Sequence, residues 1–260
     1  MVLPRIIPVL LLSNRGLVKT VKFKKLKYLG DPINAVKIFN SKLADEIVLL
    51  DITATEQGKE PDYDLIEVIG KEAFMPFSYG GGINKVCQAL KILKLGAEKV
   101  ILNSVLFEDE KIVTEISNSV GKQSVVASID IKKNFFGKYV VVKNRGEKNT
   151  KIDPIEFAKK MENLGAGEIF INNVDLDSEM KGYDLEYMKN IIDAVNVPVV
   201  ISGGAKNKED IIRAFNETKV SGCAAGSMFV YNGELRGFLI SYLNVDDIVS
   251  KIKRNTYEEI

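Results

Sequence analysis

The stretch Pro76-Phe77-Ser78-Tyr79-Gly80-Gly81-Gly82 has a counterpart 122 residues further along the chain, Pro198-Val199-Val200-Ile201-Ser202-Gly203-Gly204. Each copy opens on proline and closes on adjacent glycines, two residue types that dictate backbone geometry. Other pairs match at the same spacing, namely Asp31-Pro32 with Asp153-Pro154, Glu46-Ile47 with Glu168-Ile169, and Asp62 with Asp184. Because the offset is longer than a solenoid unit, it predicts two half-domains related by duplication.

Eight strand-like runs recur along the chain, and their apolar character is almost continuous. Such runs are typical of parallel strands that are buried on both faces of a sheet. We predict strands at residues 5–11, 46–51, 76–79, 99–102, 125–130, 168–173, 198–202 and 221–225.

Helix signals fill the intervals between these runs. Aspartate followed by proline, as in Asp31-Pro32 and Asp153-Pro154, is typical of an N-cap and first helical position. Amphipathic spacing predicts further helices at residues 85–95, 108–120, 185–194 and 208–215. Eight strand–helix units in two similar halves predict an α/β fold, a single (β/α)8 TIM barrel over residues 1–260. Its half-barrels are expected at about 1–122 and 123–245, with a C-terminal helix at 245–253. Two separate open domains are disfavoured, because the sequence near residue 122 does not resemble a linker.

The composition excludes several classes of function. The 260 residues carry a formal net charge of +1 and no long basic tract, so neither nucleic acid nor a membrane is an expected partner. The apolar stretch at 6–12 is too short to span a bilayer and lacks a signal-peptide cleavage region, so we expect a cytoplasmic protein. The absence of histidine excludes Ser-His-Asp catalysis and His-ligated zinc. Cys87 and Cys223 have no CxxC partner, so we expect two buried thiols and neither a metal nor a cofactor.

Two longer segments follow the first and fifth predicted strands, at residues 12–30 and 131–150. The first is rich in lysine and arginine and contains Lys19. The second alternates like a hairpin, with Phe135-Phe136-Gly137 at its turn. Both follow the carboxyl ends of strands, where barrel enzymes place their sites, so both are candidate lids over a substrate.

Glycine-rich turns follow the third and seventh strands, as Gly80-Gly81-Gly82 and Ser202-Gly203-Gly204. Such turns let backbone amides reach a phosphate, although tight turns also use glycine where no ligand binds. A small polar cluster after the next strand accompanies each turn, Asn103-Ser104 in the first half and Gly226-Ser227 in the second. Two equivalent pairs predict two opposed phosphate sites and an elongated small molecule with a phosphate at each end.

Three carboxylates follow strands at the same face. Asp130 ends an apolar strand, where partial burial raises a carboxyl pKa and suits it to acid–base work; capping of the next loop is the alternative. Asp51 is expected either to orient a ligand or to tie down Lys19 and nearby amides. Asp177 is either a site residue or a solvated loop carboxylate, and spacing alone gives Lys19 no functional role.

Arg5, Glu46, Lys99 and Glu168 lie at the opposite, amino-terminal ends of their strands. Two cations and two anions are therefore expected to converge on the barrel floor. Position alone favours a ring of salt bridges that closes the floor.

Several motifs together carry a family resemblance. They are Arg5-Ile6-Ile7-Pro8, Leu49-Leu50-Asp51-Ile52-Thr53-Ala54, Gly80-Gly81-Gly82-Ile83, Ile129-Asp130, Lys148-Asn149-Thr150, Gly182-Tyr183-Asp184 and Ser202-Gly203-Gly204-Ala205. With these motifs the chain resembles the cyclase subunit of imidazole glycerol phosphate synthase over about residues 4–245. The resemblance implies a (β/α)8 barrel that pairs with a glutaminase subunit, whose ammonia enters the floor and crosses the barrel. It also implies that ammonia reacts at the top with a ribulosyl bisphosphate to give imidazole glycerol phosphate.

The resemblance also implies roles for single residues. Asp130 matches one of the family's two catalytic aspartates, Lys19 matches a flexible-loop lysine, and Asp51 and Asp177 match supporting positions. Two groups match the family's phosphate sites, Gly81, Gly82, Asn103 and Ser104 for one and Gly203, Gly204, Gly226 and Ser227 for the other. The floor residues match a charged gate through which ammonia enters: Arg5, Glu46, Lys99 and Glu168. This match favours a gate over the closed ring of salt bridges that position alone favours.

One position departs from the family pattern. The other catalytic aspartate falls on Leu11, which is followed by Leu12-Ser13-Asn14-Arg15-Gly16 instead of an acidic pattern. Leucine cannot exchange a proton, and a general acid or base typically contributes about 10²–10⁴-fold in rate. We therefore expect ammonia transfer without the usual cyclase chemistry. In this respect the chain resembles a divergent branch that acts with a glutaminase and a separate sugar amidotransferase to install acetamidino groups on surface sugars.

Three alternatives stay open. A genuine cyclase of histidine biosynthesis would need Asp51 or Asp177 to replace the missing carboxylate. The related sugar-phosphate isomerase, also a duplicated barrel, needs the same first-strand carboxylate and has no use for an ammonia gate. A non-catalytic scaffold that activates the glutaminase would leave Asp130 and Lys19 as relics.

Overall fold

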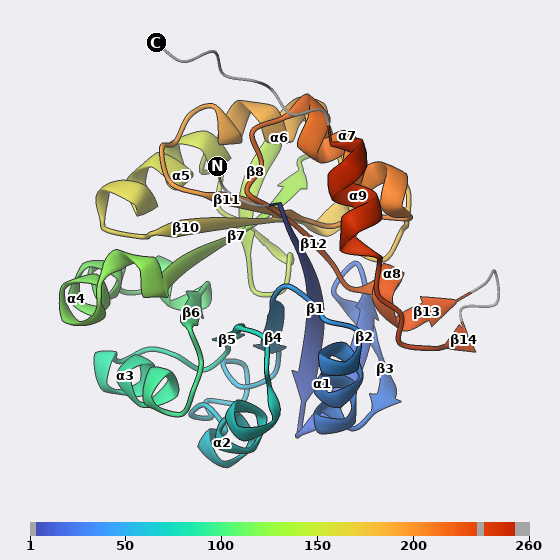
Figure 1. The fold of residues 1–260 in the computed structure, drawn as a ribbon. Coiled ribbons are helices and arrows are strands. Elements are labelled where there is room, and N and C mark those ends of the chain that lie inside the picture. Colours follow the sequence, from blue (N-terminus) through green and yellow to red (C-terminus); the bar gives the residue numbers. More distant parts are fainter. Residues whose placement is uncertain (1–3, 233–236, 253–260) are drawn as a thin grey trace, which may run out of the picture.

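A closed ring of eight parallel strands forms the centre of the computed structural model, which describes residues 4–232 and 237–252. The ring runs in the order β10-β11-β12-β1-β4-β5-β6-β7, and pairing of β7 with β10 closes it (Figure 1). The predicted (β/α)8 barrel is therefore confirmed. The bounds are β1 (Arg5–Ser13), β4 (Ile47–Asp51), β5 (Phe77–Gly80), β6 (Lys99–Leu102), β7 (Val125–Lys133), β10 (Glu168–Asn173), β11 (Val199–Ser202) and β12 (Gly222–Ala225).

Helices surround the ring of strands (Figure 1). Asp31 and Asp153 cap α1 and α5 through side-chain oxygens that accept two backbone N–H bonds each, as predicted. Helix α4 begins at Lys111 instead of the predicted residue 108, because residues 108–110 form an irregular turn after the 3-10 helix η1 (Ser104–Phe107). The bounds are α1 (Pro32–Ser41), α2 (Tyr63–Glu72), α3 (Val86–Lys94), α4 (Lys111–Val120), α5 (Pro154–Asn163), α6 (Leu185–Ile192), α7 (Lys208–Glu217), α8 (Ser227–Val230) and α9 (Val245–Lys251). Residue 253 of the predicted C-terminal helix lies outside the described residues, and the division into half-barrels stays a prediction.

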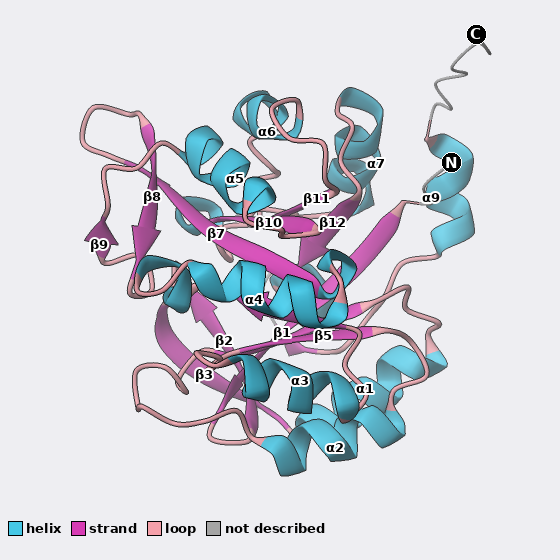
Figure 2. Cartoon of the chain, turned by 90° about the vertical axis from the view of Figure 1, so that its left-hand side faces the viewer, coloured by secondary structure: helices cyan, strands magenta, loops and turns pink. Residues whose placement is uncertain are grey.

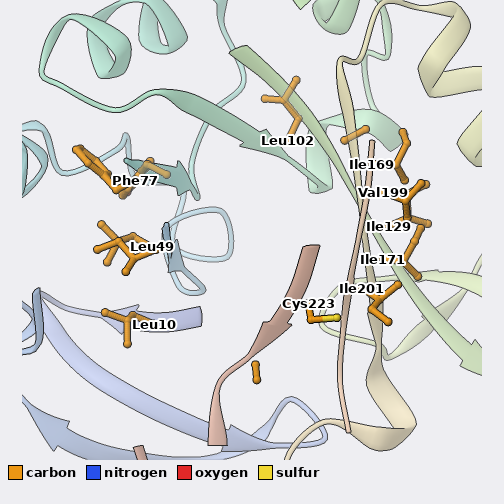
Figure 3. Close-up of a cluster of buried hydrophobic side chains, with 14 of the residues drawn as sticks. Leu10, Leu49, Phe77, Leu102, Ile129, Ile169, Ile171, Val199, Ile201 and Cys223 are labelled. Carbon is orange, nitrogen blue, oxygen red and sulfur yellow. The ribbon is translucent and has the colours of Figure 1, made fainter. Parts of the chain in front are cut away.

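Alternate residues of each strand point to opposite faces, so the barrel has two apolar layers. The outer layer packs between strands and helices, and Figure 3 shows labelled members of it on all eight strands. The inner layer lines the barrel interior and forms a separate cluster that includes Ile7, Val9, Val48, Val126 and Val200. Burial of each such side chain typically stabilises the fold by about 1.5–3 kcal/mol.

Two hairpins extend from the carboxyl ends of the strands, at the same end of the barrel (Figure 2). The segment 12–30, expected as a long loop, folds into β2 (Gly16–Val21) and β3 (Lys24–Gly30). β2 pairs antiparallel with β1, and β3 pairs antiparallel with β2. Two-residue turns at Asn14-Arg15 and Lys22-Phe23 have the positive φ angles that suit tight hairpins. The second segment is a hairpin as predicted, because β8 (Tyr139–Lys143) returns along β7.

The two cysteines differ in their surroundings. Cys223 is buried on β12, as expected, whereas Cys87 is exposed on α3. The prediction for Cys87 was wrong because it sits on the solvent side of an amphipathic helix whose buried side carries Gln88, Ala89 and Ile92. Both thiols are free.

Candidate functional site

A cavity of about 430 Å³ lies at the carboxyl ends of the strands, within the barrel mouth. Residues from both halves of the sequence and from both long segments, 12–30 and 131–150, contribute to its wall. Most of the residues expected to form a site line it: Lys19, Asp51, Gly81, Gly82, Asn103, Ser104, Asp130, Asp177 and Gly226.

Asp130 lies near the end of the parallel part of β7, beside Asn172 of β10. Its Oδ2 accepts a hydrogen bond from Nδ2 of Asn103 at 3.1 Å, and its Oδ1 accepts one from Nδ2 of Asn172 at 3.3 Å. Burial raises the pKa of Asp130 to about 6, against the two amide bonds, which favour the ionised form. A carboxyl group that titrates near neutrality is able both to accept and to return a proton.

Asp177 holds the β2–β3 hairpin against the barrel mouth. Its Oδ1 accepts from Nζ of Lys19 at 3.0 Å, and its Oδ2 accepts from Oγ1 of Thr20 at 3.2 Å and from the backbone of Phe23 at 3.3 Å. Lys19 is 5% exposed. Asp177 is therefore not the solvated loop carboxylate of the second alternative, because it forms a largely buried ion pair with Lys19 in the cavity wall.

Asp51 lines the cavity but is engaged with its own loop. Its Oδ1 accepts from the backbone and hydroxyl of Thr53 at 2.9 and 3.0 Å and from the backbone of Ala54 at 3.0 Å. Of the two carboxylates, it is Asp177 that pairs with Lys19. Asp51 therefore shapes the segment that follows β4.

Leu11 gives the cavity an apolar wall. It lies beside Leu50 in the register of β1 and β4, and both residues line the cavity with Val9 and Ile52. Leu11 also belongs to the inner apolar cluster of the barrel, together with Val18 of the hairpin. The apolar lining of the interior is therefore continuous with the wall of the cavity.

The two glycine turns differ in their access to the cavity. Gly81 and Gly82, with φ angles of +124° and +70°, both line it. A Cβ atom on Gly81 would collide with the carbonyl oxygen of Asp51, so the close approach needs glycine. Among the described residues, Gly203 and Gly204 do not reach the cavity wall, although Ser202 and Gly226 do.

At the other end of the barrel, the four predicted floor residues form a closed ring of alternating charge. Arg5 contacts Glu46 at 2.8 Å and Glu168 at 2.7 Å, and Lys99 contacts the same two carboxylates at 3.4 and 3.2 Å. Ser78 donates a further hydrogen bond to Glu46 at 3.0 Å. The side chains of the two glutamates are 6% and 8% exposed, so the ring is largely desolvated.

Several cavity residues were missed by sequence reasoning. Asn172 was detectable, because it continues the inward-facing alternation of Glu168 and Phe170 on β10. Arg145 was not, because its position depends on tertiary contacts: it pairs with Glu56 at 3.1 Å and donates to the carbonyl of Phe23 at 3.3 Å. It thus links three loops across the cavity mouth.

Neither a metal cluster nor a membrane helix is found in the part of the chain that the structure describes. In residues 4–232 and 237–252, no group of three or more acidic or cysteine side chains is arranged to hold a metal ion. Over the same ranges, none of the helices combines the length and apolarity that a membrane crossing requires.

The fold and cavity define a closed (β/α)8 barrel with a titratable carboxyl group at its mouth and a charged floor. A family model described as "Histidine biosynthesis protein" matches residues 5–236, and the chain belongs to this family. Within it, the chain is a HisF-like synthase subunit.

Named relatives cover nearly the whole chain. A Vibrio vulnificus (strain YJ016) protein named "Putative imidazole glycerol phosphate synthase subunit hisF3" is 52% identical over 239 residues, 92% of each chain. A Pseudomonas aeruginosa protein named "Putative imidazole glycerol phosphate synthase subunit hisF2" is 48% identical over 248 residues, 95% of this chain and 99% of its own. "Imidazole glycerol phosphate synthase subunit HisF" of Lactococcus lactis subsp. cremoris (strain SK11) is 41% identical over 232 residues, 89% and 90% of the two chains.

Proposed function

We propose that this chain is the synthase subunit of a glutamine amidotransferase complex and that it conducts ammonia from a glutaminase partner to the barrel mouth. There the ammonia serves acetamidino modification of a surface sugar by a separate amidotransferase, in place of imidazole ring closure. The observation that carries this proposal is the apolar wall at Leu11, where the resemblance places a catalytic carboxylate.

The wall matters because ring closure by acid–base catalysis needs groups that exchange protons. Leu11, Val9 and Leu50 present only hydrocarbon to the cavity. The carboxylate offered as a substitute, Asp51, accepts three hydrogen bonds through one oxygen within its own loop. The other substitute, Asp177, is paired with Lys19. Asp130 is thus the described carboxyl group best suited to proton transfer in this cavity.

The barrel interior supports the transport step. Its lining between floor and cavity is apolar, so it favours neutral ammonia over the ammonium ion, because an unpaired ion is costly to desolvate. In this proposal the ring of Arg5, Glu46, Lys99 and Glu168 is the gate at which ammonia enters from the glutaminase. Asp130 is the titrating group at the far end of the path.

A second candidate function is that of a genuine cyclase in histidine biosynthesis. Asp130, with its pKa raised to about 6 and its two amide donors, favours this candidate, because the arrangement suits general acid–base catalysis. The names of the relatives favour it as well.

The deciding experiment is ammonia-dependent turnover of the ribulosyl bisphosphate substrate by the isolated chain. We expect turnover at least about 100-fold below that of a family cyclase, since one acid–base group is missing. Leu11→Asp tests whether a carboxylate at that position restores turnover, and Leu11→Asn is the matched control of similar shape without a titrating proton. Turnover typical of the family in the unmodified chain would establish the cyclase instead.

A complex reconstituted with its glutaminase separates a conducting barrel from a scaffold. Asp130→Asn should leave glutaminase stimulation intact and lower amidation of the downstream acceptor. If both readouts match those of the unmodified complex, Asp130 has no part in delivery and the scaffold alternative is favoured.

A further inference from the structure

The small polar cluster after β12, Gly226-Ser227, is engaged by the protein's own polar groups, whereas Ser104 of the first half is not. Ser178, in the loop after β10, lies between Ser227 of this cluster and the β2–β3 hairpin. Its Oγ is 2.8 Å from Oγ of Ser227 and donates to the carbonyl oxygen of Thr20 at 2.6 Å. Ser178 and Ser227 are both 5% exposed. The hydroxyl expected to hold a phosphate in this half is therefore already engaged.

Ser178 holds this position in an unfavourable backbone conformation. Its φ angle is +62°, in the left-handed region that residues with a Cβ atom rarely adopt. Such strain persists where the surrounding structure over-determines it. The two hydrogen bonds of the Ser178 hydroxyl provide that support, so its side chain is a built-in component of this end of the cavity.

The cation at the same end is engaged in the same way. Nζ of Lys19 would lie 3.4 Å from a Cβ atom placed on Gly226, so the ammonium group approaches the second-half cluster closely. It is paired with the carboxylate of Asp177 at 3.0 Å. The carboxylate of the protein thus supplies the negative charge that the second phosphate of an elongated ligand would bring.

The serine of the first half is not engaged in this way. Gly81, Gly82, Asn103 and Ser104 all line the cavity. The side-chain amide of Asn103 donates to the carbonyl of Ser128 and to Asp130, but within the described ranges the hydroxyl of Ser104 takes part in no hydrogen bond. In these same ranges the backbone N–H groups of both glycine pairs donate to no protein acceptor, so the two halves differ in their serines and in the access of their glycines to the cavity. The first-half donors that line the cavity point to an anion that comes from outside the chain.

The charge of the cavity wall also limits which chemical groups a ligand can carry. The lining contains five carboxylates and two cations, and both cations are ion-paired, Lys19 with Asp177 and Arg145 with Glu56. Neutral hydroxyl groups are compatible with such a wall, whereas a second dianion would be repelled by it.

We propose that the cavity binds a small molecule that carries a single phosphate, held at the first-half turn, and that Ser178 and the Lys19–Asp177 pair close the second-half site. The ligand class is a monophosphorylated compound with a neutral, hydroxyl-bearing remainder. This inference rests on the proposed function of a HisF-like synthase subunit and on the sequence-based expectation that the glycine turns bind phosphate, and it is independent of whether ammonia crosses the barrel.

The test is a titration of the full chain with inorganic phosphate. ¹H–¹⁵N NMR of the backbone amides locates the binding site, and the titration gives the number of equivalents bound. We expect one equivalent to bind and the amides of Gly81 and Gly82 to shift, while those of Gly203 and Gly204 stay in place. Ser104→Ala should weaken binding by about tenfold or more, because a hydrogen bond to a charged group is lost. Ser227→Ala, the matched serine of the other half, should leave the affinity unchanged.

Ser178→Gly provides the gain-of-binding arm. Glycine adopts the left-handed conformation without strain and removes the hydroxymethyl group, so the variant should fold and bind a second equivalent, with shifts at Gly203 and Gly204. If the unmodified chain binds two equivalents of phosphate, or binds the first equivalent at Gly203 and Gly204, the inference is overturned. The assignment of the glycine turns as phosphate sites would then still hold. Binding at neither turn would overturn both assignments, and the ammonia-dependent turnover assay remains a separate readout.

Discussion

Asn172 donates its side-chain amide to Oδ1 of Asp130 at 3.3 Å, directly across the β7–β10 pairing that closes the barrel. Asn103 donates to the other carboxylate oxygen, so each oxygen of Asp130 has one amide donor. The carboxyl group is thereby fixed in orientation at the mouth of the barrel. Burial and these two bonds act in opposite directions on its pKa, and burial prevails.

The first prediction concerns the pH dependence of stability. The pKa of Asp130 is about 6 in the folded chain, against 3.8 for an unperturbed aspartate, so the folded state binds more protons between these values. The free energy of unfolding should therefore fall as pH rises from about 4 to about 6, by about 3 kcal/mol in total. Asp130→Asn should remove this fall, as measured by urea denaturation at each pH. Asp64→Asn, at an exposed position of α2, should retain it, and parallel curves for Asp130→Asn and the parent chain would refute the assignment.

The second prediction concerns the β2–β3 hairpin. Asp177→Ala removes the acceptor of Lys19, Thr20 and the backbone of Phe23, and leaves a buried ammonium group without its anion. Breaking a buried ion pair typically costs about 3–5 kcal/mol, which is enough to release a hairpin locally. Hydrogen exchange of residues 16–30 should accelerate at least about 100-fold. Glu179→Ala, which removes exposed ion pairs to Lys22 and Lys181, should change it little. Equal protection in both variants would mean that Asp177 does not hold the hairpin.

The third prediction concerns the floor ring. Glu168→Ala leaves Arg5 and Lys99 with one carboxylate in place of two, in a setting where the glutamate side chain is 8% exposed. We expect the free energy of unfolding to fall by about 3 kcal/mol, because two largely desolvated charges lose a partner. Glu217→Ala breaks the exposed pair with Arg213 on α7 and should change the free energy of unfolding far less, because water screens an exposed pair. Chemical denaturation of the two variants provides the comparison, and equal losses would show that the ring is solvated like a surface pair.

The fourth prediction concerns the first glycine turn. Gly81→Ala places a Cβ atom against the carbonyl of Asp51 at a φ of +124°, so the turn must shift. Gly58→Ala meets open space at a φ of +60° and should cost only about 1 kcal/mol. Gly81→Ala should destabilise the chain more than Gly58→Ala in thermal unfolding and should also reduce phosphate binding. A smaller loss for Gly81→Ala would mean that the close approach at this turn is not required.

The strands and most helices could be predicted because their signals are local. Parallel strands buried on both faces leave continuous apolar runs, and Asp-Pro marks helix starts by capping chemistry. The β2–β3 hairpin escaped prediction because β3 is exposed and lysine-rich, so no apolar run marks it. β2 forms through antiparallel pairing with β1, which extends β1 to Ser13, and within the described residues β3 pairs only with β2.

Cavity residues could be predicted from the sequence where they directly follow a strand, as Asp130 and the glycine turns do. It was not predictable where two distant loops must meet. Ser178 carries no sequence signal, because its role arises from the proximity of Ser227 and of the hairpin carbonyl at Thr20. Arg145 is similar, since its partners Glu56 and Phe23 come from different connections.

The floor ring has a topological consequence. Each cation bridges the same two carboxylates, so the four side chains form two parallel links between Glu46 and Glu168. If Lys99 swings out towards the solvent, Arg5 still joins both carboxylates, and no anion is stranded inside the protein. Because the two bridges are redundant, movement of Lys99 can open the ring by the width of one side chain while Arg5, Glu46 and Glu168 stay paired.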